Sequence, residues 1–177
     1  MDHLLKLNKQ LFNNNNLKYF IMQTITINLY SFKELTKEIQ DKAIEQNLLI
    51  NLHDQWYINM YEDAICHGFK IIEFNLDRAN FCKIENIDSF QEIAKNINPY
   101  NKDLHLIAQN FLSKYEQLES KELYECIEDL ENEFKEDLEN EYLGFLRNEY
   151  DFLMSDQCIK DHLISLGECF NEDGTIF

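Results

Sequence analysis

The strongest constraint in this sequence is the stretch from Ser120 to Leu153, which contains no proline and keeps a helical period throughout. Its apolar residues recur three or four positions apart, at Leu123, Ile127, Leu130, Phe134 and Leu138. This spacing predicts one long amphipathic helix over 120–153. Beyond Glu141 the apolar set shifts to Tyr142, Leu146, Tyr150 and Leu153. We therefore expect the helix to change partners, bend or break near residues 141–144.

The rest of the chain also favours long regular elements, because its 177 residues include only one proline and four glycines. The glycine-rich motifs of P-loop proteins, dinucleotide-binding folds and nucleophile-elbow hydrolases cannot be assembled from this sequence. An apolar fraction of 45% is enough to form a hydrophobic core. These numbers exclude several enzyme classes and favour a mostly helical globular protein.

The pattern of polar and apolar residues predicts the other elements. Residues 24–30 alternate as a half-buried strand does, and Ser31 with Glu34 forms a capping box that opens a helix. Further elements follow as helices over 54–67, 88–96 and 101–118, strands over 69–76 and 79–84, a helix over 155–167, and a hairpin over 169–177. The predicted fold is α+β, with a small antiparallel sheet and mostly helical mass.

The first 21 residues differ in charge from the remainder. Residues 1–21 carry +2 and contain four consecutive asparagines, whereas residues 22–177 carry −19. We interpret 1–21 as an N-terminal extension, either lying upstream of an original start at Met22 or forming a short amphipathic helix. Residues 22–177 are predicted to form a single α+β domain.

The net charge of −17 is concentrated in one element. Residues 116–141 hold twelve carboxylates and two lysines, a net charge of −10. Such a field repels phosphate backbones, so we expect no direct contact with nucleic acid and instead a basic, nucleic-acid-binding protein as the partner. The carboxylates predicted to bind it are Glu125, Glu128, Asp129, Glu136 and Glu139. The alternative is that these residues form only a solvated helix face.

Other chemistry has weaker support in the sequence. Five scattered cysteines without a CxxC pair fit a reducing cytoplasm, and the sequence contains neither an export signal nor a long apolar run. We predict no metal site and no cofactor, and we interpret Cys66 and His67 as a small buried cysteine and a helix C-terminal histidine. Catalysis by His105 or His162 with nearby carboxylates remains an alternative to the prediction that the protein is not an enzyme.

Two features of the sequence have no assigned role. Trp56 and Tyr57 are interpreted either as core aromatics or as aromatics that bind a ligand. Arg78 is one of only two arginines and lies at a strand junction.

Two segments resemble a family of small acidic proteins encoded by phages and mobile elements. The opening, from Ile25 to Leu35 (ITINLYSFKEL) and from Gln40 to Glu45 (QDKAIE), resembles the start of that family. The ending, from Asn148 to Asp156 (NEYDFLMSD) and from Phe170 to Gly174 (FNEDG), resembles its C-terminus. Members are often labelled antitoxin-like. The family commonly has a glycine-containing loop after its second strand, and the matching stretch from Leu76 to Lys83 lacks both glycines.

A small acidic protein of this kind also resembles anti-CRISPR proteins. The low glycine content and the abundance of Asn, Ile and Lys are typical of an AT-rich bacterial host, in which type VI-B RNA-targeting CRISPR nucleases occur. We therefore expect a non-catalytic inhibitor, located in the cytoplasm of the bacterial host cell, that binds such a nuclease or its guide-RNA complex. The alternative is an antitoxin or partner-masking protein of a toxin–antitoxin system.

Overall fold

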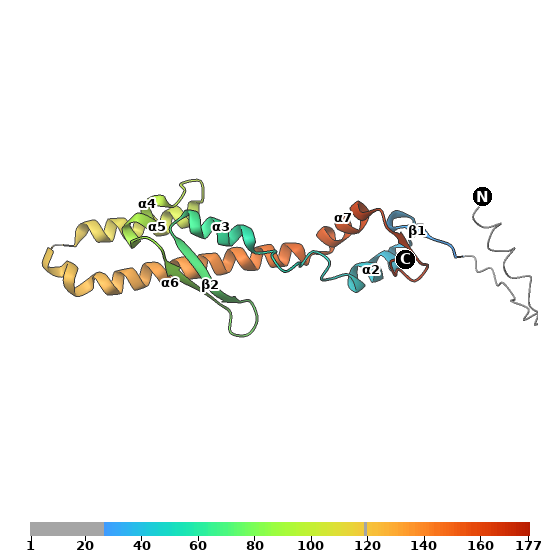
Figure 1. Cartoon of the computed structure of the whole chain (residues 1–177), viewed down its shortest axis with the longest axis horizontal. Coiled ribbons are helices and arrows are strands. Elements are labelled where there is room, and N and C mark those ends of the chain that lie inside the picture. The colour runs from blue at the N-terminus through green and yellow to red at the C-terminus, as the bar shows by residue number, and fades with distance from the viewer. Residues whose placement is uncertain (1–26, 119) are drawn as a thin grey trace, which may run out of the picture.

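The molecule is an elongated rod built along one helix (Figure 1). The computed structural model describes residues 27–118 and 120–177, and describes side chains in these ranges except those of 120–125. Helix α6 (Ser120–Leu153) has 34 residues and forms the long axis. The predicted extension over 1–21 and the first part of the strand predicted from Thr24 lie outside the described residues.

A single buried row runs along α6. Its members are Leu130, Phe134, Leu138, Tyr142 and Leu146, spaced four residues apart, and each is 0–9% exposed. The helix continues through residues 141–144, so the break that was considered there does not occur. The expected change of packing partner does occur. The row first contacts helix α5 (Lys102–Gln117) and then the hairpin of β2 and β3. The predicted shift of the apolar set therefore reflects a change of neighbour.

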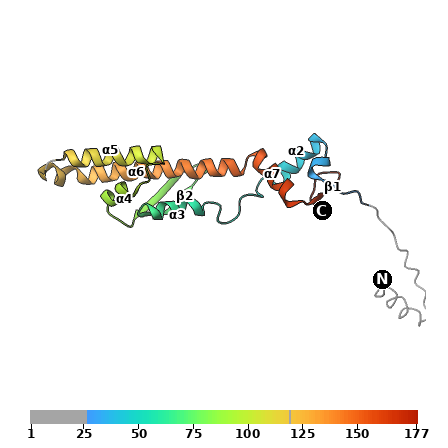
Figure 2. The ribbon, with the colours of Figure 1, turned by 90° about the horizontal axis from the view of Figure 1, so that it is seen from above.

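Four further elements pack against α6 and α5. They are helix α3 (Ile58–Cys66), strand β2 (Phe69–Asn75), strand β3 (Phe81–Asn86) and helix α4 (Phe90–Asn96). In the view of Figure 2, α6 lies between α5 on one side and the layer of β2 and α3 on the other. The predicted helices and strands of this region are confirmed, with α3 beginning four residues later than expected and β3 two residues later.

A hairpin of two strands follows α3 directly, after a turn at Gly68. Strands β2 and β3 pair antiparallel, with a bulge between Ile71 and Glu73, and direct buried Phe69, Ile71, Cys82 and Ile84 toward the core. Gly68 connects α3 to β2 with φ +94°, a conformation that favours glycine. A Cβ at this position would lie 2.5 Å from Asp88 Oδ2. Gly68 therefore marks the end of α3, in agreement with the helix predicted over 54–67.

A second, smaller core lies at the other end of the rod. It is formed by strand β1 (Tyr30–Ser31), the 3-10 helix η1 (Phe32–Glu34), helix α2 (Lys37–Gln46), helix α7 (Asp156–Leu166) and strand β4 (Cys169–Phe170). β4 pairs antiparallel with β1, and Phe170 also bridges to Ile176, which confirms the expected C-terminal hairpin. The rings of Phe32 and Phe170 pack edge to face, with centroids 5.7 Å apart.

The first predicted helix is split in two. Glu34 accepts a hydrogen bond from the Ser31 backbone at 2.8 Å, as a capping box requires, but only the short η1 follows. Thr36 then caps α2, where its hydroxyl accepts a hydrogen bond from the Ile39 backbone. The break lets Phe32 and Leu35 both reach the small core, which the capping pattern alone did not reveal.

The overall prediction of an α+β fold with mostly helical mass and little antiparallel sheet is confirmed. The described chain contains two hydrophobic cores. The assignment of residues 22–177 to a single domain stays a prediction.

Asn51 links the segment between α2 and α3 to the junction of α6 and α7. It lies between α2 and α3, is 9% exposed, and donates to the carbonyl oxygen of Leu153 at 3.0 Å, where α6 ends. The side-chain oxygen Oδ1 of Asn51 accepts a hydrogen bond from His162 Nδ1 at 2.5 Å. His162, one of the two histidines considered as catalytic candidates, is therefore hydrogen-bonded to Asn51 at this junction.

We expect the Asn51→Ala substitution to destabilise the protein by about 1–3 kcal/mol, because it leaves the Leu153 carbonyl and the His162 ring without their partner in a largely buried place. Urea unfolding followed by circular dichroism measures this loss. Asn59→Ala, at an exposed position on α3, serves as the matched control and should leave the unfolding free energy nearly unchanged. Equal stability of the two variants would contradict a linking role for Asn51.

Candidate functional site

The outward face of α6 is the candidate site, and the buried row determines which residues it contains. With Leu130, Phe134 and Leu138 turned to the core, positions about half a turn away face solvent. Asp129 and Glu136 occupy such positions, and both are exposed. Glu128 is also exposed, at one side of this face. We call Glu128, Asp129 and Glu136 the acidic face.

The five predicted partner-binding residues do not all have the same surroundings. Three of them form the acidic face, and the side chain of Glu125 lies outside the described residues. Glu139 is only half exposed, since its carboxylate accepts a hydrogen bond from the backbone N–H of Ile84 at 3.0 Å. It also lies 4.0 Å from Lys135 Nζ. Glu139 therefore holds β3 against α6 in addition to adding negative charge.

None of the three carboxylates of the acidic face forms an ion pair with a described cation. The ion pairs on this part of α6 involve other carboxylates, Glu133 with Lys114 at 2.6 Å and Glu139 with Lys135. The charges of Glu128, Asp129 and Glu136 are therefore available to a partner.

Carboxylates on and beside α6 lie close enough to raise one another's pKa values. Partial burial raises the pKa of Glu131, and the nearby charge of Glu128 raises it further. Partial burial also raises the pKa of Glu141, with a smaller contribution from Asp103. A cation brought by a partner would relieve this repulsion.

The charge density resembles that of a nucleic acid strand. Between Cys126 and Glu141 the helix carries eight carboxylates and one lysine, Lys135, in 16 residues, a net charge of −7. At about 1.5 Å of rise per residue this is one net negative charge per roughly 3.4 Å. A strand of B-DNA carries one phosphate per about 3.4 Å of helix axis. The helix can thus present a comparable linear charge to a surface that binds phosphates.

A hydrogen-bond network beside the larger hydrophobic core joins a tyrosine, a histidine and an aspartate, residue types that also occur together in catalytic sites. The Tyr142 hydroxyl donates to Asp63 Oδ2 at 2.6 Å and lies 3.0 Å from His67 Nδ1, while the Asn98 backbone N–H donates to His67 Nε2 at 3.4 Å. These contacts fit a neutral His67 that donates through Nδ1 to the tyrosine oxygen. Tyr142 is 0% and His67 5% exposed. These hydrogen bonds join α3 to α6, while Asp63 is exposed and lines a pocket together with His67 and Asn98.

The structure corrects the prediction of a small buried cysteine at Cys66, since Cys66 is exposed and its neighbour His67 is the buried residue. The expected position of His67 at the C-terminus of α3 is confirmed. The role of Tyr142 was missed because only its apolar character was used in the sequence pattern. Its hydroxyl finds partners on α3, which sequence spacing does not reveal.

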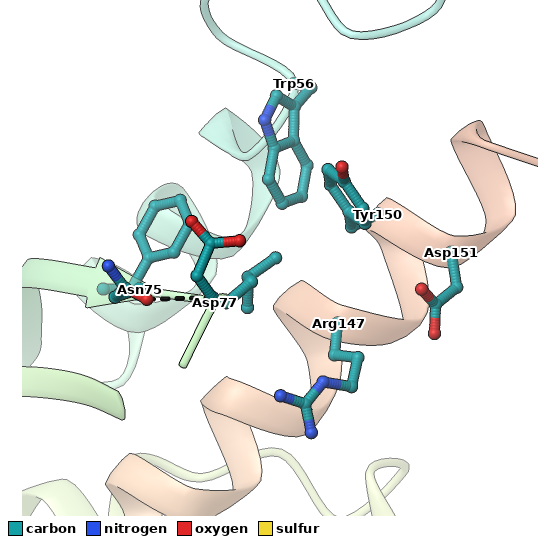
Figure 3. A pocket seen from close by; sticks show the side chains of 8 residues that line it. Trp56, Asn75, Asp77, Arg147, Tyr150 and Asp151 are labelled. Carbon is teal, nitrogen blue, oxygen red and sulfur yellow. Dashed lines mark hydrogen bonds between the residues drawn. The ribbon is translucent and has the colours of Figure 1, made fainter. Parts of the chain in front are cut away.

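The structure also gathers residues that the sequence left unassigned. Trp56 meets Phe74 of β2 and Tyr150 of α6, at centroid distances of 5.9 and 5.8 Å. These rings line a pocket together with Asp77 and Arg147 (Figure 3). Arg78 is exposed in the same β2–β3 turn. The pocket could not be anticipated, because its residues come from three separate parts of the chain.

No group of three or more His, Cys, Asp or Glu side chains in 27–118 and 120–177 is arranged to hold a metal ion. Within these same ranges, no helix combines the length and the apolar character needed to cross a membrane.

The fold and site define an α+β protein organised around one long acidic helix. Comparison of the chain with protein-family models, with curated proteins and with solved structures found no match.

The Tyr142→Phe substitution should lower the unfolding free energy by about 1–3 kcal/mol, because the buried His67 ring loses its hydrogen-bond partner. Chemical denaturation of the two proteins measures the difference. Tyr115→Phe on α5 is a suitable control, since Tyr115 is half-buried and its hydroxyl forms no hydrogen bond with a described residue. A variant as stable as the parent protein would show that the network contributes nothing to folding.

Stability should decrease with rising pH above about 9, because burial of Cys82, with a further contribution from Glu139, raises its thiol pKa from 9.0 to about 12. Between pH 9.0 and about pH 12 the Cys82 thiol loses its proton in the unfolded state and keeps it in the folded state. The free energy of unfolding therefore falls by up to about 1.4 kcal/mol per pH unit. Burial also raises the pKa of Tyr142, which adds to the fall above about pH 10.

Urea unfolding at about pH 8 and about pH 10 measures this slope, which Cys82→Ala should flatten. Cys169→Ala, at an exposed position, should keep the slope of the parent protein. Identical slopes for all three proteins would refute the assignment to Cys82.

Proposed function

We propose that this protein is a non-catalytic inhibitor that binds an RNA-guided CRISPR nuclease of its bacterial host, in the cytoplasm, through the acidic face of α6. The observation that carries the proposal is the exposed set of Glu128, Asp129 and Glu136, which form no ion pair with a described cation. A surface that normally binds phosphate groups is the partner that such carboxylates fit best.

A basic RNA-binding channel is the partner whose electrostatics fit best. The linear charge of α6 is close to that of a nucleic acid strand, so the helix can compete for lysines and arginines that otherwise hold RNA. The net charge of −17 accelerates encounter with such a surface and weakens encounter with nucleic acid itself. Because these charges are exposed, salt should weaken the complex strongly.

The choice among basic partners rests on resemblance. The opening and ending segments resemble small phage and mobile-element proteins, and the composition is typical of AT-rich bacterial hosts, in which type VI-B nucleases occur. An antitoxin would use the same acidic face against a basic toxin. The experiments below separate the two.

The double substitution Asp129→Lys and Glu136→Lys should strongly weaken inhibition of RNA cleavage by a type VI-B nuclease, since it changes four units of charge on the acidic face. We expect at least a tenfold increase in the concentration needed for half inhibition, which corresponds to about 1.4 kcal/mol. A fluorescent-RNA cleavage assay at low and high salt measures the effect. Inhibition by the unaltered protein should fade as salt increases.

The matched control is the pair Glu38→Lys and Glu45→Lys on α2, which changes the net charge equally at exposed positions outside α6. It should retain most of the inhibition. Equal loss in both variants would assign the effect to net charge instead of to α6. If the unaltered protein does not inhibit the nuclease but restores growth of cells that express a toxin encoded beside it, the antitoxin alternative replaces this proposal.

A further inference from the structure

A pocket of about 410 Å³ lies between the turn that follows β2, the residues that precede α3, and the C-terminal half of α6 (Figure 3). Its volume is within the range of small-ligand sites, about 300–1,000 Å³. It is separate from the acidic face, because its α6 residues begin at Arg147, eleven positions beyond Glu136. The site proposed above does not use it.

Aromatic rings form one wall of this pocket. Trp56 and Tyr150 meet at a centroid distance of 5.8 Å with their planes tilted by 60°, and Phe74 meets Trp56 edge to face. Figure 3 shows Trp56 and Tyr150 side by side at one end of the pocket. Electron-rich rings of this kind attract a cation placed over their faces, and tryptophan does so most strongly.

Two carboxylates supply the charge. Asp77 comes from the β2–β3 turn, where the side-chain oxygen of Asn75 accepts a hydrogen bond from the Asp77 backbone at 2.8 Å and fixes the turn. Asp151 comes from α6, and both carboxylates are exposed to an entering ligand. Because the two acids lie on separate elements, they can approach a ligand from different directions.

The one cation in the lining is already engaged. Arg147 donates a hydrogen bond to the side-chain oxygen of Asn80, a residue in the left-handed conformation at φ +46°. The lining therefore has two negative charges against one positive charge that is hydrogen-bonded elsewhere. An anionic ligand would meet net repulsion here and in the overall field of the protein.

We propose that this pocket binds the guanidinium group of an arginine side chain from a protein partner. A guanidinium is planar, so it can stack on an aromatic ring while its N–H groups donate to a carboxylate. A lysine ammonium lacks the planar fork and is more strongly hydrated, so it should bind less well. The inference concerns binding by the free protein and holds whether or not the partner is a CRISPR nuclease.

The protein offers a direct readout, because Trp56 is its single tryptophan. Titration of the full chain with Nα-acetyl-arginine amide should produce a saturable change in tryptophan fluorescence. The double variant Asp77→Asn and Asp151→Asn should weaken this binding by about tenfold, as the loss of two charge-assisted contacts implies. Nα-acetyl-lysine amide should bind several-fold more weakly than the arginine compound.

The control is Asp103→Asn with Asp137→Asn, which makes the same two chemical changes at exposed positions on α5 and α6, outside both the pocket and the acidic face. It should bind the arginine compound as the parent protein does, and circular dichroism should confirm that both variants are folded. A response to inorganic phosphate that Arg147→Met removes would overturn the proposal in favour of an anion site. Equal binding of the arginine and lysine compounds, or no saturable response to either, would also overturn it.

Discussion

Burial of one row of side chains on α6 is the constraint on which the rest of this structure depends. Leu130, Phe134 and Leu138, with the two members that follow them, are withdrawn from water by α5 and the β2–β3 hairpin. Each large apolar side chain buried in this way contributes about 1.5–3 kcal/mol. That contact fixes the rotation of the helix about its axis, and so determines which carboxylates face solvent and which approach the strands.

The same burial explains how the chain tolerates so much like charge on one element. Neighbouring carboxylates one turn apart destabilise a helix by about 0.2–0.5 kcal/mol per pair, as for Asp129 with Glu133 and Glu133 with Asp137. These costs are smaller than the gain from the buried row. The one polar member of the row, Tyr142, is accommodated because Asp63 and His67 satisfy its hydroxyl. An acidic surface is therefore compatible with a stable fold here.

Both proposed contact regions include residues of α6. From Glu136 in the acidic face to Asp151 in the aromatic pocket the helix rises about 22 Å. A basic partner that engaged both would meet long-range attraction along the acidic face and a shaped anchor at the pocket. Charge would then govern the rate of encounter, and the stacked guanidinium would govern how long the complex lasts.

The sequence by itself determined the elements whose signals are local. The row from Leu130 to Leu138 predicted α6, Ser155 and Gly167 marked the ends of α7, and the composition indicated the acidic character of the protein. It also identified Glu125, Asp129 and Glu136 as outward, with Glu128 beside them, because one helix period relates them to the buried row. Glu139 was grouped with them, since period alone does not reveal that a strand edge would offer the Ile84 N–H.

Only the tertiary structure decided features that join distant segments. Asn51 meets His162 across 111 positions, and Trp56 meets Tyr150 from another element. Tyr142 completes its network with α3 in the same way. Such contacts depend on how helices and strands pack, and a periodic pattern carries information about one face of one element. The fold class and the acidic face were therefore readable from sequence, whereas the junction, the buried network and the aromatic pocket were not.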